Sequence, residues 1–209
     1  MKPSNITFII KFEDGEELTI DRSFLKDFSY TVESSSSNST VGFGIIANSG
    51  TLQFFDKNDS IIRKIKTISG ENYISVEMLL NGSKQLSFVC DSAIDYNVYD
   101  KTITFNLLSP FVSWQKVFVK LGIGYAGLGA DASLSNGIAY EIFSFLKNCS
   151  VPFEIVAEPS LLAEMKQTKI TIPYLELDTL WNQWNKLCNL LGLRMFQDKD
   201  NLIKVVKII

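Results

Sequence analysis

Short apolar segments alternate with polar turns along the first half of the chain, at spacings of about ten residues. The clearest turns are Asp14-Gly15 and Asn81-Gly82, each between two apolar segments, which is typical of a β-hairpin. The segments predicted as strands are Ile6–Phe12, Leu18–Ile20, Phe24–Val32, Thr51–Phe55, Ile61–Ile68, Tyr73–Leu80, Gln85–Asp91, Ile94–Tyr99 and Thr102–Leu107. This spacing predicts a small antiparallel β-barrel or sandwich over residues 1–110.

The apolar residues follow a helical period after Pro110. A first helix is predicted because Ile138, Ile142, Phe143 and Leu146 share one helical face. A strand, a turn-like piece and another strand are predicted next, at Phe153–Ala157, Pro159–Met165 and Lys169–Ile172.

A second helix is predicted to begin after Asp178, a good N-cap residue, and to end at Gly192. Its apolar stripe consists of Leu180, Trp181, Trp184, Leu187, Cys188 and Leu191. A hairpin follows, with strands at Arg194–Gln197 and Asn201–Ile209. Residues 111–209 are therefore expected to form an α+β domain with two helices, and the whole chain is expected to be a β-rich α+β protein of two domains.

The composition indicates a folded, soluble protein. The chain has 209 residues, of which 46% are hydrophobic and 12% aromatic, so it can bury a substantial core. No apolar segment approaches the roughly 20 residues that cross a membrane, and the start Met1-Lys2-Pro3-Ser4 lacks the apolar core of a signal peptide. We expect a protein made in the cytoplasm without a membrane segment, with an exposed polar loop over residues 33–40.

The chain contains no histidine, which removes the commonest general base and metal ligand at neutral pH. Cys90, Cys149 and Cys188 are far apart and odd in number, which favours buried free thiols over disulfides or a zinc site. The net charge is −3 and the basic residues are scattered, so a phosphate backbone has no obvious binding surface. We expect no enzyme activity, no cofactor, no metal site and no nucleic-acid-specific site.

Four other patterns have a simple structural interpretation beside a chemical one. The glycines of Gly122–Gly127 match a dinucleotide-binding motif but lack a surrounding βαβ unit, which favours a surface loop. Asp56–Asp59 resembles the start of a calcium loop but favours a β-turn, and the carboxylates of Glu13–Glu17 are expected at a solvated hairpin tip. Trp181 and Trp184 are expected to be core residues of the second helix. The alternative interpretation is that they line a groove that binds a carbohydrate or a peptide.

Two parts of the chain carry motifs of one known family. In residues 42–59 (GFGIIANSGTLQFFDKND), behind a serine-rich segment, Asn-Ser-Gly precedes a strand and an Asp-rich turn, and residues 96–109 (YNVYDKTITFNLLS) supply a closing strand. From Ile138 to Val206 a helix, a strand, an Ile172-Pro173-Tyr174 strand, a helix and a hairpin follow one another. Both parts resemble the successive domains of phage tail hub and baseplate proteins.

The resemblance implies a structural component of the virion tail, without catalytic residues. Such hubs form homotrimers or pseudo-sixfold rings that join the tail tube, or a distal tail protein, to a tip or spike protein. Larger hubs continue into a second barrel beyond the position of Ile209.

The candidate contact residues are few. Those singled out are Ser34, Ser35 and Ser36 in the serine-rich loop, Asn48, Ser49 and Gly50 in a predicted turn, and Phe145 beside the apolar stripe of the first helix. Two alternatives stay open: a carbohydrate-binding module for host attachment, suggested by the aromatic residues, and an enzyme based on carboxylates or the glycine motif.

Overall fold

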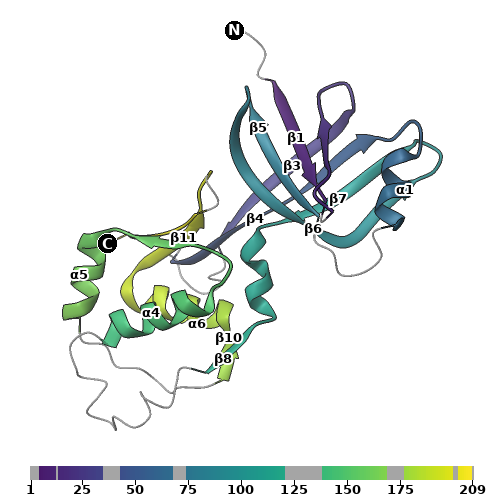
Figure 1. Ribbon diagram of the computed structural model, residues 1–209. Helices are drawn as coiled ribbons and strands as arrows, with labels where there is room; N and C mark the ends of the chain where they lie inside the picture. The colour runs from purple at the N-terminus through teal and green to yellow at the C-terminus, as the bar shows by residue number, and fades with distance from the viewer. Residues whose placement is uncertain are drawn as a thin grey trace. The chain divides into compact units, whose positions relative to one another are not determined.

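The computed structural model describes residues 5–12, 14–34, 43–67, 74–120, 138–168, 177–199 and 202–208. The chain forms two compact units (Figure 1). Unit 1 comprises Met1–Glu33 and Asn48–Pro110, and unit 2 comprises Ser34–Ala47 and Phe111–Ile209. A single boundary at residue 110 is predicted from the sequence. In the structure the start of strand β4 (Gly44–Phe55) pairs with a strand of unit 2, so the chain enters that unit twice.

Unit 1 is built on one antiparallel sheet. Its strands are β1 (Ile6–Lys11), β2 (Glu17–Ile20), β3 (Leu25–Ser34), β4, β5 (Ser75–Leu80), β6 (Ser83–Asn97) and β7 (Thr102–Leu108). They pair in the order β2-β1-β5-β6-β7-β4, and β3 pairs with β4 as well. Alternate residues of these strands fill the core of the unit, as the buried Phe8, Ile10, Leu52 and Phe54 illustrate.

The sheet of unit 1 curls around its apolar face (Figure 1). The ring centroids of Phe8 on β1 and Phe28 on β3 lie 4.7 Å apart, although the two strands stand near opposite ends of the strand order. In the described part of the chain no backbone pairing joins β2 to β3, so the sheet is open where a barrel would be closed. The predicted class, a β-rich α+β fold, is confirmed.

Both predicted hairpin turns of unit 1 are present. Gly15 joins β1 to β2 with a φ of 85°. Asn81 and Gly82 join β5 to β6 with φ angles of 51° and 80°. Two successive positive φ angles suit the right-handed twist of the flanking strands, which is why Asn-Gly is favoured there.

The predicted strand Ile61–Ile68 is wrong, because Ser60–Thr67 forms helix α1. Ile62 is buried, and Ile61 and Ile65 pack against the core at helical spacing, with Arg63 exposed between them. Gln85–Asp91 and Ile94–Tyr99, predicted as separate strands, belong to the single strand β6, which carries a register shift between Cys90 and Ile94.

Unit 2 packs helices against a small mixed sheet. Its elements are the 3₁₀ helix η1 (Pro110–Gln115), β8 (Phe118–Lys120), α4 (Ile138–Cys149), β9 (Ile155–Ala157), α5 (Pro159–Gln167), β10 (Leu177–Thr179), α6 (Leu180–Leu191), β11 (Leu193–Gln197) and β12 (Ile203–Lys207). The sheet has the order β4-β11-β12-β9, and β8 and β10 form a separate two-stranded ribbon. The turn-like piece predicted at Pro159–Met165 is helix α5, which adds a third α-helix to the two expected.

Helix α6 has the predicted length but a different N-cap. Thr179, one residue after the predicted Asp178, caps the helix by accepting a hydrogen bond from the Asn182 N–H at 3.2 Å. Gly192 ends it with a φ of 68°, as expected for a glycine cap. The predicted strand Lys169–Ile172 lies outside the described residues.

Each unit has its own hydrophobic core. In unit 1 the core is made of aliphatic and Phe side chains, whereas unit 2 adds Trp114 and Trp184, both almost fully buried. Cys90 and Cys188 are buried, Cys149 is half-buried, and none of the three is in a disulfide. Within the described ranges, no helix combines the length and the apolar character that spanning a bilayer requires.

Candidate interaction surface

The candidate contact residues from the sequence that the structure describes fall on three different elements. Ser35 and Ser36 lie outside the described residues, and Ser34 is the last residue of β3. The residues Asn48, Ser49 and Gly50, predicted as a turn, run through the middle of β4. Phe145 is half-buried and packs against the core of unit 2, so it is not the exposed side chain that its position off the stripe suggested.

Gly50 has a structural reason to be glycine. The backbone of β3 crosses so close that a Cβ atom at Gly50 would overlap the carbonyl oxygen of Ser29 and come within 3.1 Å of the Cα atom of Tyr30. Beside it, the hydroxyls of Ser29 and Thr51 share a hydrogen bond of 2.9 Å. The Asn-Ser-Gly sequence therefore marks a close approach of two strands and not a turn.

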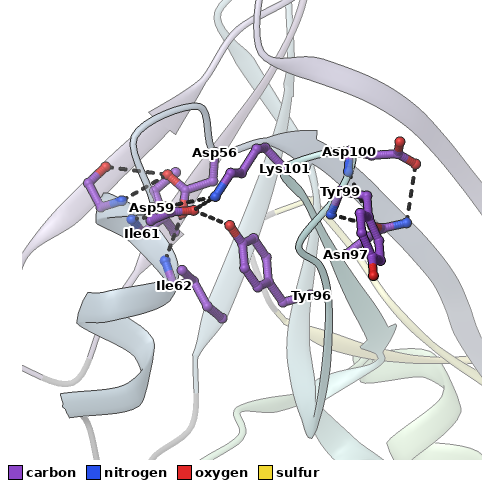
Figure 2. Close-up of polar contacts among 10 residues, drawn as sticks. Asp56, Asp59, Ile61, Ile62, Tyr96, Asn97, Tyr99, Asp100 and Lys101 are labelled. Atoms are coloured by element: carbon purple, nitrogen blue, oxygen red, sulfur yellow. Dashed lines mark hydrogen bonds and ion pairs between the residues drawn. The ribbon is translucent and has the colours of Figure 1, made fainter.

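A more distinctive feature is the hairpin tip between β6 and β7, residues 97–101. Asn97 orders the tip, because its side-chain oxygen accepts hydrogen bonds from the backbone N–H groups of Tyr99 and Asp100 at 3.0 and 3.2 Å. Its side-chain nitrogen donates to the Asp100 carboxylate at 3.2 Å. Val98 is 60% exposed and Tyr99 is 98% exposed. The tip thus presents an aromatic and an aliphatic side chain to solvent. Figure 2 shows Asn97, Tyr99 and Asp100 with the hydrogen bonds that order the backbone there.

Asp59 ties this tip to the turn before α1 (Figure 2). The Lys101 ammonium lies 2.9 Å from both Asp59 carboxylate oxygens, and the Tyr96 hydroxyl donates to the same carboxylate. These contacts, the Tyr96 hydrogen bond first, hold the pKa of Asp59 below its usual range, and the Asp59 hydrogen bond raises the pKa of Lys101. Asp59 and Lys101 both have positive φ angles, 55° and 52°, a conformation that non-glycine residues keep only where neighbouring contacts hold it.

Asp56 connects the same turn to helix α1 and to the β6–β7 hairpin. Its buried carboxylate accepts hydrogen bonds from the backbone N–H groups of Ser60, Ile61 and Ile62 at 3.0, 3.1 and 2.9 Å, which caps α1. Its own N–H donates to the carbonyl oxygen of Lys101 at 2.8 Å. The helix start, the turn and the hairpin are therefore one connected polar network.

Phe24, just before β3, and Asp95 on β6 extend the exposed surface at this tip. Phe24 is partly exposed and its carbonyl oxygen accepts a hydrogen bond from the Phe55 N–H at 2.8 Å. The Lys26 ammonium lies 3.8 Å from the Asp100 carboxylate. Asp95 is exposed two residues before Asn97. We call the exposed set Phe24, Asp95, Val98, Tyr99 and Asp100 the tip surface.

The tip surface is not predicted from the sequence, because Asp100-Lys101 there has the pattern of an ordinary turn. The signal was present in Asn97-Val98-Tyr99-Asp100-Lys101, where two large apolar residues occupy a turn that normally holds small polar ones. Only the structure shows that these residues stay exposed and that Tyr96 and Lys101 turn back to Asp59.

The other chemical patterns find structural roles or lie outside the described residues. Asp56–Asp59 is a turn and helix cap, as its simpler reading predicts. Among the described residues, no three His, Cys, Asp or Glu side chains gather closely enough to hold a metal ion. Trp184 is buried and Trp181 packs against the same core, so they do not line a groove. The glycines of 122–127 and Glu13 are outside the described ranges.

Comparisons with known proteins place this fold. No protein-family model and no curated protein matches the sequence. Among solved structures, the 43 kDa tail protein of prophage MuSo2 from Shewanella oneidensis matches 99% of this chain and 56% of its own, with a TM-score of 0.52 and 10% identity. The tail protein from Neisseria meningitidis MC58 matches 96% of this chain and 50% of its own, with a TM-score of 0.56 and 9% identity.

A third match is the structure described as the lidless PdpA-VgrG complex. It covers 98% of this chain and 35% of the matched chain, with a TM-score of 0.51 and 14% identity. This chain therefore spans about half, or less, of the length of the structures that it matches. The resemblance to phage tail proteins expected from the sequence is confirmed at the level of the fold, which runs through nearly the whole chain.

Proposed function

We propose that this chain is a structural, hub-like component of a phage tail tip or baseplate and that it resides in the tail of the virion. The observation that carries the proposal is the fold: two tail proteins of different origin share it over 99% and 96% of this chain, although only 10% and 9% of residues are identical. A fold alone permits several functions, so the proposal depends on agreement with the chain's own surface chemistry.

Ring assembly is the mode of action that we propose. The open sheet of unit 1 ends in β2 on one side and β3 on the other. Unpaired strand edges invite association, and a symmetric ring satisfies them without leading to uncontrolled growth. Exposed apolar side chains on β3, Tyr30 and Val32, lie along one of these edges. These features support a homotrimer or pseudo-sixfold ring.

The proposal includes the absence of catalysis. The chain has no histidine. Two of its carboxylates are engaged in structure: Asp56 caps α1, and Asp59 holds Tyr96 and Lys101.

Within the tail, the ring would link the tail tube to the tip or spike proteins. The third structural match belongs to a complex of two proteins, which supports a role in contacts with other proteins of an assembly. The exposed tip surface offers a rigid contact of the kind that protein interfaces favour, with an aromatic residue at its centre.

The experiment is reconstitution from the same gene cluster. The purified chain would be mixed with the tail-tube protein and with the tip or spike protein, separately and together, and the complexes would be followed by sedimentation. We expect an assembly of this chain that binds each partner and a larger complex when all three are present. A monomeric chain that binds neither partner would contradict the proposal.

A further inference from the structure

Two exposed surfaces, one in each unit, have complementary character. The first is the tip surface of unit 1, with Val98 and Tyr99 beside acidic residues. The second lies on the β8–β10 ribbon of unit 2, where Phe118 is 66% exposed and Leu177 is 63% exposed beside basic residues. We call the set Lys116, Val117, Phe118, Lys120 and Leu177 the ribbon surface.

The register of the ribbon sets the chemistry of its outer face. Val119 is buried, so its neighbours Phe118 and Lys120 point to the opposite face. Lys120 is directly opposite Leu177 on β10. Asp178 is opposite the buried Val119 and binds the Lys186 ammonium at 2.7 Å. The outer face of the ribbon therefore combines large apolar side chains with lysine and carries no carboxylate among its described residues.

Lys116 and Lys120 are exposed and make no ion pair with any residue in the described part of the chain. On the tip surface, Asp95 makes no ion pair within the described ranges, whereas Asp100 pairs with Lys26 at 3.8 Å. Lys101 does not offset Asp95, because Asp59 neutralises it. The carboxylate of Asp95 and the ammonium groups of Lys116 and Lys120 are therefore opposite charges on the two surfaces.

From this match we infer that the tip surface of one copy docks on the ribbon surface of a neighbouring copy. The inference rests on the proposed ring and names the contact that builds it. Two different surfaces meet, so the contact is heterologous and repeats from copy to copy, which closes into a ring when the rotation per copy allows. Tyr99 is the anchor that packs against Phe118 and Leu177, and Asp95 lies near Lys120.

The ordered backbone of the tip favours this role. Asn97 and the Asp59 network hold the tip before any contact forms, so docking orders few additional groups. Tyrosine has a large amphipathic ring and few rotatable bonds, which suits it to anchoring. A stable interface buries about 1,600 Å² in total, so this contact is the anchor of a larger interface.

The test is a charge-reversal cycle with an anchor substitution, measured by sedimentation equilibrium on the whole chain. Tyr99→Ala is expected to raise the dissociation constant of the assembly about 30-fold. Asp95→Lys and Lys120→Glu are each expected to raise it about 10-fold, and the two together are expected to restore most of the affinity. Leu190→Ala is the control, since Leu190 is also an exposed apolar residue and lies outside the tip surface, the ribbon surface and the strand edges of unit 1.

The wild-type measurement separates the two proposals. If the wild-type chain assembles but Tyr99→Ala assembles equally well and the charge reversals do not compensate, the tip contact is overturned and the ring stands. Equal losses in Tyr99→Ala and Leu190→Ala would also overturn it. If the wild-type chain stays monomeric at every concentration, the copy-to-copy contact and the ring fail together. Circular dichroism is expected to show all variants folded, because the substituted side chains are exposed.

Discussion

The two units of this chain stabilise their structure by different means. In unit 1, polar side chains in turns fix the geometry at the end of the sheet: Asp56 caps α1, Asp59 joins Tyr96 and Lys101, and Asn97 orders the hairpin tip. In unit 2, large aromatic rings fill the centre. The rings in contact there are Phe111, Trp114, Phe143, Phe153, Trp181 and Trp184.

Polar contacts are also present in unit 2, where hydrogen bonds hold a tryptophan of the aromatic core in place. The Trp184 indole N–H donates to the Ser150 hydroxyl at 2.9 Å, and this hydroxyl donates to the Leu146 carbonyl oxygen at 2.7 Å. The ring of Trp184 stacks on Trp114 with centroids 6.3 Å apart. The turns of unit 1 are thus fixed by hydrogen bonds and charge, whereas the centre of unit 2 depends on packed volume. The two units should therefore respond to different substitutions.

The largest effect is expected from Trp184→Ala in unit 2. Removing a fully buried indole leaves a cavity and should cost about 4 kcal/mol of unfolding free energy. All three tryptophans lie in unit 2, so the fluorescence of the remaining two follows the unfolding of that unit in denaturant. Trp181→Ala is the control, and it should cost clearly less because Trp181 is only half-buried. Equal costs would show that volume does not dominate in unit 2.

A smaller loss of unfolding free energy is expected from Gly50→Ala in unit 1. The added methyl group meets the backbone of β3, which must move away from β4, at a cost of about 1 to 3 kcal/mol. Far-UV circular dichroism during denaturation should show early unfolding of strands while tryptophan fluorescence changes late. Ser49→Ala, in the same strand, should stay within about 0.5 kcal/mol of the wild type. If Gly50→Ala is equally harmless, the two strands do not approach as closely as described.

Substitutions at the two helix caps compare how much one polar side chain contributes to stability in each unit. Asp56→Ala removes acceptors for three backbone N–H groups at the start of α1 and should cost about 2 kcal/mol. Thr179→Ala removes one acceptor at the start of α6 and should cost about 1 kcal/mol. Urea denaturation followed by circular dichroism measures both. A larger loss for Thr179→Ala would contradict the greater dependence of unit 1 on polar contacts.

The smallest effect is a pH dependence from Asp59. Its folded-state pKa is lowered, so its contribution to stability is present above the unfolded-state pKa of about 4 and is lost as pH falls below that value through the folded-state pKa. The denaturation midpoint of the wild type should therefore fall between neutral pH and strongly acidic pH by more than that of Asp59→Asn. Asp21→Asn is a useful comparison, because the pKa of Asp21 is also lowered, by Ser23, without a lysine partner. Parallel pH profiles for wild type and Asp59→Asn would contradict the role of Asp59.

Where apolar spacing and turn chemistry act locally, the sequence predicted the structure. Asn81-Gly82 and Gly15 predicted their hairpins because few residues adopt positive φ angles as readily. Helix α6 was predicted over its full length because its stripe is long and Gly192 ends it. The resemblance to tail proteins was predicted from turn and packing patterns, and such patterns persist in the fold at 9% and 10% sequence identity.

The sequence-based predictions were wrong where residues far apart in the sequence determine the local structure. Ile61–Ile65 looks extended in a short window, and it is a helix because Asp56 caps it and the core accepts Ile62 on one side. Gly50 looked like a turn residue because the strand that crosses it is about twenty positions away in the sequence. The tip surface depends on the pairing of β6 with β7 and on Asp59, contacts that no local pattern contains.

We propose that copies of this chain assemble into a ring. The measurement that tests this most directly is the mass of the protein in solution, determined by light scattering over a range of concentrations and combined with image averages of the particles. The account predicts one closed species of threefold or pseudo-sixfold symmetry whose mass does not grow further with concentration. A monomer at every concentration, or an open filament that lengthens with concentration, would contradict it.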